Sequence, residues 1–343
     1  MKKILFLLKK SSNYHVDNYD TGKLKSGLYN SARLVAEALS EFKGIETKLE
    51  LCIDGNDVDN KLFKYKPNIC IIEAIWITPT KLKELQKLHP NIDFVVRIHS
   101  KIPFLAMEGV AIDWIKQYML IKNVKVAFNN KKTHSDLNFI ELQNTYLPNI
   151  YEKINKSKKC IFKKTTNRNK TKSVYDISCF GAIRPLKNQL NQAVAAIKFG
   201  DMNNSVVNFY VNSSRLEQSG ENVLKNLRAL FADTNHNLIE VEWLCRKDFL
   251  ELLSKMDVSM QVSLTETFNI VAADSVLVKV PVVISKEIDW LSTGIADPND
   301  VCSMVKQIYY VLNHKNNIIC ENNNSLAKYN KKAIFEWKKF ILD

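Results

Sequence analysis

At residues 262–284 the chain reads VSLTETFNIVAADSVLVKVPVVI. This stretch predicts a strand at Asp257–Ser263, a short polar turn, a helix from about Asn269 and a second apolar strand at Val280–Ile284. Two strands joined by a helix form one βαβ unit of a parallel sheet. The turn lies at the carboxyl end of the first strand, which is where open α/β sheets bind their ligands.

Two carboxylates lie in the quoted stretch, Glu266 in the turn and Asp274 about one and a half turns into the helix. Both can accept hydrogen bonds from hydroxyl groups. The first-turn amides of Asn269, Ile270 and Val271 would point at an anion, because they lack partners within the helix and the helix dipole is positive there. The combination suits a nucleotide-sugar, although an ordinary buried unit with solvated acids has the same pattern.

The run from Glu266 to Asp274, followed by Val280-Pro-Val-Val283, resembles the Glu-x7-Glu signature of family-4-type retaining glycosyltransferases (glycosyl transferases group 1). The chain departs from that signature in having Asp274 for the second Glu and Lys279 for a small residue. The resemblance implies the GT-B fold, an α/β architecture of two Rossmann-like domains whose parallel sheets face a cleft. It also implies a nucleotide-diphosphate sugar donor and transfer with retention.

The length of 343 residues suits two domains, and a composition of 46% hydrophobic and 25% charged residues is ordinary for a globular protein. We expect an acceptor domain at 1–150, a basic linker at 151–173 and a nucleotide-sugar-binding domain at 174–324. The terminal helix, 325–343, crosses back to the first domain if the resemblance holds.

In the second domain, residues 181–189 read GAIRPLKNQ and resemble the family's Gly-Arg-x4-Lys loop, whose cations hold the donor diphosphate. Lys187 stands at the lysine position, whereas Ala182 stands at the arginine position. Arg184, two residues later, either substitutes for that arginine or leaves one phosphate contact missing. A cation here would neutralise the charge that grows on the leaving diphosphate, without a metal ion.

In the first domain, the apolar strand at Lys3–Leu8 is followed by a loop and a helix that begins near Ser26 and Gly27. A glycine there lets a phosphate or sugar approach the backbone closely. His99 closes another strand, and the resemblance implies that it contacts the donor sugar. A structural histidine is the alternative.

No metal or other cofactor is expected. Asp57-Val-Asp59 has the form of a DxD metal signature, but its context predicts a solvated turn. The seven cysteines show no metal-binding spacing and are expected to be reduced thiols of a cytoplasmic protein, in the host cytoplasm if the protein is viral. The apolar run that ends at Leu8 is too short for a signal peptide, and we expect no stable membrane insertion.

The net charge of +13 is concentrated in one place, because nine Lys and Arg residues and no acid lie between Lys153 and Tyr175. The rest of the chain has 40 basic and 36 acidic residues. A second basic group lies on the predicted terminal helix, at Lys328, Lys331, Lys332, Lys338 and Lys339. These groups suggest double-stranded DNA as a partner, with a hydroxylated base in phage DNA as the acceptor, which the enzyme would have to extrude.

The sequence therefore predicts a metal-independent glycosyltransferase. The alternatives are transfer to a lipid or cell-surface polysaccharide, a nucleotide-sugar hydrolase or epimerase, and a non-catalytic nucleic-acid-binding protein with a degenerate GT-B fold. The candidate catalytic residues are Lys187, Glu266 and His99. The candidate donor-binding residues are Arg184, Asn269, Ile270, Asp274, Gly27 and Ser26.

Overall fold

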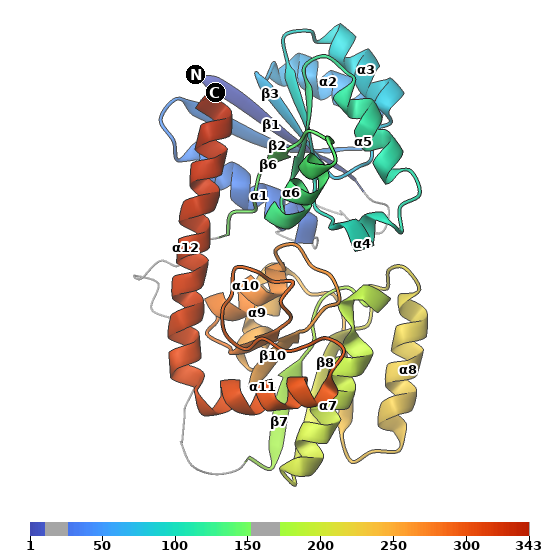
Figure 1. Cartoon of the computed structure of the whole chain (residues 1–343), viewed down its shortest axis with the longest axis vertical. Helices are drawn as coiled ribbons and strands as arrows, with labels where there is room; N and C mark the ends of the chain where they lie inside the picture. Colours follow the sequence, from blue (N-terminus) through green and yellow to red (C-terminus); the bar gives the residue numbers. More distant parts are fainter. Residues whose placement is uncertain (11–26, 152–171, 343) are drawn as a thin grey trace. The chain divides into compact units, whose positions relative to one another are not determined.

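The structure, a computed structural model, describes residues 1–10, 27–151 and 172–342. These residues form two compact units (Figure 1). Unit 1 contains residues 1–10, 27–151 and 329–342, and unit 2 contains residues 172–328. Ser26 and most of the predicted linker, including all of its basic residues except Lys172, lie outside the described residues.

Unit 1 is built on a parallel six-stranded sheet with the order β2-β1-β3-β4-β5-β6. Its strands are β1 (Lys2–Lys9), β2 (Ile45–Cys52), β3 (Ile69–Glu73), β4 (Asp93–Ile98), β5 (Val124–Phe128) and β6 (Thr145–Tyr146). Its helices are α1 (Gly27–Ser40), α2 (Gly55–Tyr65), α3 (Pro79–Leu88), α4 (Ile102–Leu105), α5 (Ala111–Met119) and α6 (Lys131–Phe139).

Alternate residues of the central strands of unit 1 enter two different apolar clusters, because successive side chains of a strand point to opposite faces. Leu5 and Leu7 of β1 pack in the cluster that includes residues of α2, α3 and α5. Ile4 and Phe6 pack in the cluster that includes α1 and the end of α12 (Lys315–Leu342). The sheet is therefore buried on both faces, as the apolar strands predict.

Unit 2 contains a second parallel sheet, of five strands in the order β11-β10-β7-β8-β9. Its strands are β7 (Val174–Ser178), β8 (Val206–Asn212), β9 (Asn237–Val241), β10 (Val258–Gln261) and β11 (Val282–Ile284). Its helices are the 3-10 turn η1 (Pro185–Lys187), α7 (Gln189–Met202), α8 (Gly220–Ala232), α9 (Arg246–Ser254), α10 (Ile270–Leu277) and α11 (Val301–Asn313). Two parallel sheets with covering helices confirm the predicted α/β class.

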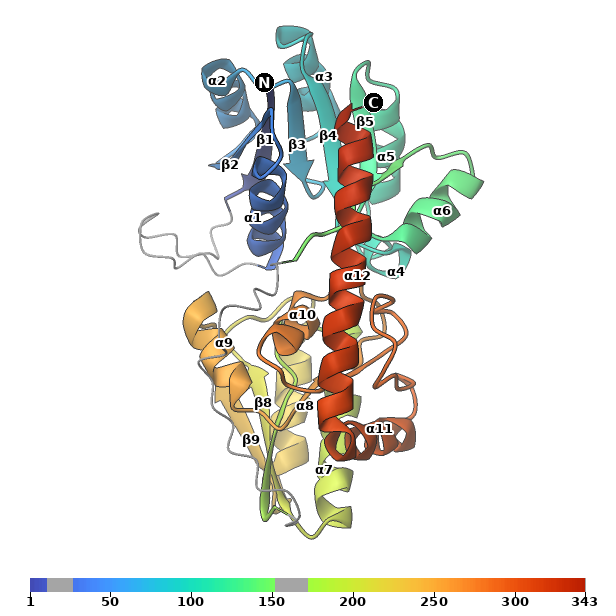
Figure 2. The same ribbon diagram turned by 90° about the vertical axis from the view of Figure 1, so that its left-hand side faces the viewer.

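The long helix α12 contributes residues to both units (Figure 2). Its residues up to Lys328 belong to unit 2, and those from Tyr329 belong to unit 1. It begins ten residues earlier than the sequence predicts. Among the described helices, none combines the length and the apolar character that crossing a bilayer requires.

The prediction of a solvated turn at Asp57-Val-Asp59 is wrong, because both residues lie in α2. The carboxylate of Asp54 caps this helix by accepting hydrogen bonds from the amides of Asn56 and Asp57, at 2.8 and 2.9 Å. A side-chain acceptor at this place satisfies amides that have no partner in the first turn, so the polar sequence starts a helix instead of a loop.

A buried charge network joins β3, β4 and the segment after β6 to α12. Arg97 of β4 is fully buried and its guanidinium contacts the equally buried carboxylate of Glu73 at 3.0 and 3.1 Å. It also donates to Asn149 Oδ1 at 2.6 Å and lies over the ring of Trp337, 5.3 Å from its centroid. The indole N–H of Trp337 donates to the carbonyl of Pro148 at 2.8 Å. The end of α12 is therefore fixed on a compensated charge pair.

Replacing Arg97 by Met should destabilise the chain by about 3–5 kcal/mol, because it leaves the Glu73 carboxylate buried without a cation. Urea unfolding followed by circular dichroism measures this change. The matched control is Lys132→Met, which removes an exposed cation paired with Asp136 in the same unit. An Arg97→Met variant as stable as this control would contradict the account of the network.

Candidate donor site

The loop between β7 and α7 carries the two predicted phosphate-binding cations. It leaves the strand through Gly181, whose φ of +119° is a conformation that side chains disfavour, and ends at Asn188 with φ 61° and ψ 30°. Between them, Arg184 and Lys187 lie at the two ends of the short turn η1. Parallel strands present such loops at the carboxyl edge of the sheet.

Neighbouring elements hold this loop in place. The amide of the Asn188 side chain donates to the carbonyl of Val262 at 3.1 Å, and Gln192 accepts from the amide of Val262 at 2.8 Å. On the other side, Gly220 at the start of α8 approaches the carbonyl oxygen of Ile183 so closely that an added Cβ would lie 2.1 Å from it. The position of the loop is therefore fixed by β10 and α8.

The stretch from β10 to β11 forms the predicted strand, turn, helix and strand. Asn269, with φ 61°, caps α10 by accepting from the amide of Ala272 at 2.8 Å. Its side-chain amide donates to Gln261 Oε1 at 2.9 Å and to Glu266 Oε2 at 3.2 Å. Glu266 also accepts from the amide of Thr267 at 3.1 Å. The carboxylate of Glu266 is thus oriented by the start of the helix.

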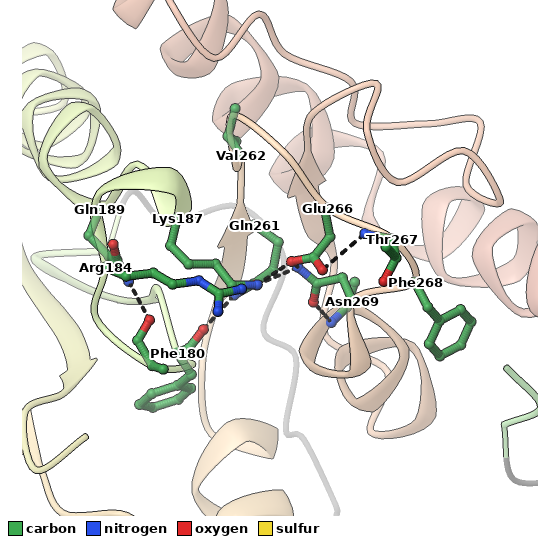
Figure 3. A network of polar contacts seen from close by, with 12 residues as sticks. Phe180, Arg184, Lys187, Gln189, Gln261, Val262, Glu266, Thr267, Phe268 and Asn269 are labelled. Atoms are coloured by element: carbon green, nitrogen blue, oxygen red, sulfur yellow. Dashed lines mark hydrogen bonds and ion pairs between the residues drawn. The ribbon is translucent and has the colours of Figure 1, made fainter. Parts of the chain in front are cut away.

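Lys187 and Glu266 form an ion pair between the two loops, and Figure 3 shows both side chains pointing toward one another. Only 14% and 10% of these side chains are exposed. Burial tends to raise the pKa of Glu266, but the charges of Lys187 and Arg184 outweigh it and hold that pKa below its usual value. Glu266 is therefore ionised and Lys187 faces it as a cation.

Arg184 reaches toward the same pair from the other end of η1 (Figure 3). Its guanidinium contacts Glu217 at 3.1 Å, and Glu217 also contacts Arg215 at 2.7 Å. Arg215 in turn lies over the ring of Trp243, 4.6 Å from its centroid. A single carboxylate thus holds two arginines, of which Arg184 lies close enough to affect the titration of Glu266.

Asp274 is also in α10, but it makes a different ion pair. Its Oδ1 lies 3.0 Å from Nη1 of Arg246, the first residue of α9, and its side chain is 2% exposed. Sequence reasoning missed Arg246, Arg215 and Glu217. Each follows a strand of unit 2 at the carboxyl edge, and that shared position is the signal that could have found them.

In unit 1, both ring nitrogens of His99 are engaged. Nε2 contacts the Glu73 carboxylate, and the amide of Asn129 lies 3.2 Å from Nδ1. Because a carboxylate only accepts, we assign the proton to Nε2 and the acceptor role to Nδ1. Gly27 begins α1, where an added Cβ would meet nothing within 4 Å. The roles of His99 and Gly27 toward a donor stay predictions.

Unit 2 therefore brings together four of the predicted residues, Arg184, Lys187, Glu266 and Asn269, with Ile270 next in the chain. Two cations and the start of a helix can bind a diphosphate, and an oriented carboxylate can accept from sugar hydroxyls. In the described part of the chain, no group of His, Cys, Asp and Glu is placed to hold a metal ion.

No protein-family model matches the sequence, and no curated protein matches it either. Solved structures do resemble the fold. Apo OtsA superposes with a TM-score of 0.68 at 12% identity, covering 99% of this chain and 98% of that one. Anabaena Alr3699/HepE in complex with UDP and glucose gives 0.65 at 14% identity, with 99% and 98% covered. The E. coli trehalose-6-phosphate structure bound with UDP-2-fluoro glucose gives 0.63 at 11% identity, again with 99% and 98% covered. These neighbours are GT-B proteins, which confirms the predicted fold.

The stability of the chain should fall as the pH is lowered from 7 to 5, in part because of His99. Burial and the charge of Arg97 lower the pKa of His99 from 6.5, despite the opposing effect of Glu73. The unfolded chain therefore binds a proton below about pH 6.5 that the folded chain does not bind until its lower pKa is reached. Between pH 7 and pH 5, the urea midpoint should change less with pH for His99→Asn than for wild type. An equal change in both proteins would show that His99 does not titrate in this way.

Proposed function

We propose that the chain is a glycosyltransferase that moves a sugar from a nucleotide-diphosphate sugar to an acceptor hydroxyl, with retention of configuration. The observation that carries this proposal is the Lys187–Glu266 pair, set between the loop after β7 and the start of α10. The fold it shares with structures that hold UDP and glucose or UDP-2-fluoro glucose supports the same class of donor.

The chemistry follows from the charges. The bond between the anomeric carbon and the β-phosphate oxygen breaks, and the acceptor oxygen bonds to the same face of that carbon. The acceptor proton passes to the departing phosphate oxygen. Lys187, Arg184 and the first amides of α10 would stabilise the negative charge that grows on the diphosphate. Glu266, released from Lys187 by the competing phosphate, would accept hydrogen bonds from the sugar hydroxyls.

The proposal identifies the acceptor only as a molecule that carries a hydroxyl group. A DNA acceptor stays a prediction, since the first basic group lies outside the described residues except for Lys172, which pairs with Asp257. Lysines of the second group are exposed on α12, and Lys338 lies over the ring of Phe42 at 4.3 Å, which is an intramolecular contact. The described structure adds nothing that favours DNA over a carbohydrate or lipid-linked acceptor.

The direct test is incubation with UDP-glucose, ADP-glucose and GDP-mannose, with nucleoside diphosphate release as the readout, in the presence of candidate sugar, lipid-linked and DNA acceptors. Lys187→Ala should lower kcat by about 10²–10³-fold, because it removes charge stabilisation of the leaving group. Glu266→Gln should also lower turnover. The matched control is Lys198→Ala, an exposed lysine of α7. A Lys187→Ala enzyme that works at the wild-type rate would refute this site.

Activity should persist in EDTA, because Lys187, Arg184 and the start of α10 supply positive charge at the diphosphate without a metal ion. The measurement compares initial rates of nucleoside diphosphate release with and without excess chelator. Loss of activity that manganese or magnesium restores would contradict the metal-independent mechanism.

A further inference from the structure

Because Arg246 pairs with Asp274, the accessible polar group beside α10 is a guanidinium and not a carboxylate. The family that this sequence resembles has a glutamate at this position, whereas Asp274 is shorter by one methylene. Its side chain is 2% exposed, and Oδ1 is engaged by Arg246 at 3.0 Å. Arg246 keeps 16% of its side chain exposed. The more exposed member of the pair is therefore a hydrogen-bond donor, not an acceptor.

The packing of α9 against α10 places this pair. Phe249 and Leu250 of α9 and Val271 of α10 pack on one apolar cluster with the buried Phe180. Figure 1 and Figure 2 both show the two helices side by side. Because Arg246 is the first residue of α9, its side chain leaves the helix at the end that follows β9, at the carboxyl edge of the sheet.

The distance along α10 from the helix start to Asp274 matches the position expected for the ribose, which follows the diphosphate in the donor. Asp274 comes five residues after the cap Asn269, which corresponds to a rise of about 7.5 Å along the helix axis. If the diphosphate binds at Lys187 and the helix start, the ribose is the next group of the nucleotide. We infer that Arg246, oriented by Asp274, donates a hydrogen bond to the ribose O2′ of the donor and is the residue that selects ribose.

This inference rests on the proposed donor site and gives the buried Asp274 a defined task. A buried carboxylate needs a cation, and a planar guanidinium held by one carboxylate loses less freedom when it donates to a second group. Asp274 is then a positioning residue, and Arg246 is the residue that touches the nucleotide. The hydroxyl oxygen O2′ accepts the bond, so the roles are reversed relative to an acidic residue at this place.

The test is calorimetric titration of the full chain with UDP, ADP and GDP, followed by the 2′-deoxy form of whichever binds most tightly and by inorganic pyrophosphate. Wild type should bind the ribonucleotide about ten- to a hundredfold more tightly than the deoxy form, as expected for one lost charged hydrogen bond. Arg246→Met should abolish that ratio and leave pyrophosphate binding unchanged. Because this variant strands a buried carboxylate, the double variant Arg246→Met/Asp274→Asn is measured beside it.

The control is Arg228→Met, which removes an exposed arginine paired with Glu240 and should keep the wild-type ratio. If the double variant keeps the wild-type ratio while Lys187→Ala weakens pyrophosphate binding, Arg246 does not contact the ribose and the donor site still stands. Loss of pyrophosphate binding in the double variant would also overturn the inference. Wild-type protein that binds neither nucleotide nor pyrophosphate would contradict both the inference and the proposed function.

Discussion

The ion pair of Lys187 and Glu266 is the interaction on which the account of unit 2 depends. Neither charge can be left without a partner at this depth, since an unpaired buried charge costs several kcal/mol. Each residue therefore holds the other in the absence of a ligand. A diphosphate offers Lys187 a stronger anion, and sugar hydroxyls offer Glu266 neutral donors. On donor binding, Lys187 would thus exchange Glu266 for the diphosphate, and Glu266 would exchange Lys187 for the sugar hydroxyls.

Paired charges recur where loops leave the sheets. Glu217 holds Arg184 and Arg215, Asp274 holds Arg246, and Glu73 holds Arg97 beside His99. Each arrangement fixes a cation by a carboxylate, which reduces the freedom that the cation loses on meeting an anion or a hydroxyl. The exposed fraction of each arginine side chain indicates whether it supports the fold or can meet a ligand. Arg97 is fully buried and supports the fold, whereas the arginines of unit 2 keep part of their side chains accessible.

The fold and the proximity of Lys187 to Glu266 could be predicted because their signals are local. Apolar strands, helix spacing and the positions of Lys187 and Glu266 just after strands need only short stretches of sequence, and parallel strands bring such residues to one edge. Contacts between distant elements could not be predicted in this way. The partner of Asp274 lies on another helix, and the charge pair of Glu73 and Arg97 lies near the carboxyl ends of β3 and β4, whose other buried residues are apolar. The helix at Asp57 was missed because a side-chain cap can make a helix start from residues that also favour turns.

The most direct test of the central claim is a crystal structure of the chain with the nucleoside diphosphate that it binds most tightly. The account predicts that Lys187 Nζ leaves Glu266 and lies within about 2.7–3.2 Å of a β-phosphate oxygen. Arg184 and the first amides of α10 should face the same phosphate. A nucleotide bound elsewhere in the chain, with the Lys187–Glu266 pair intact, would contradict it.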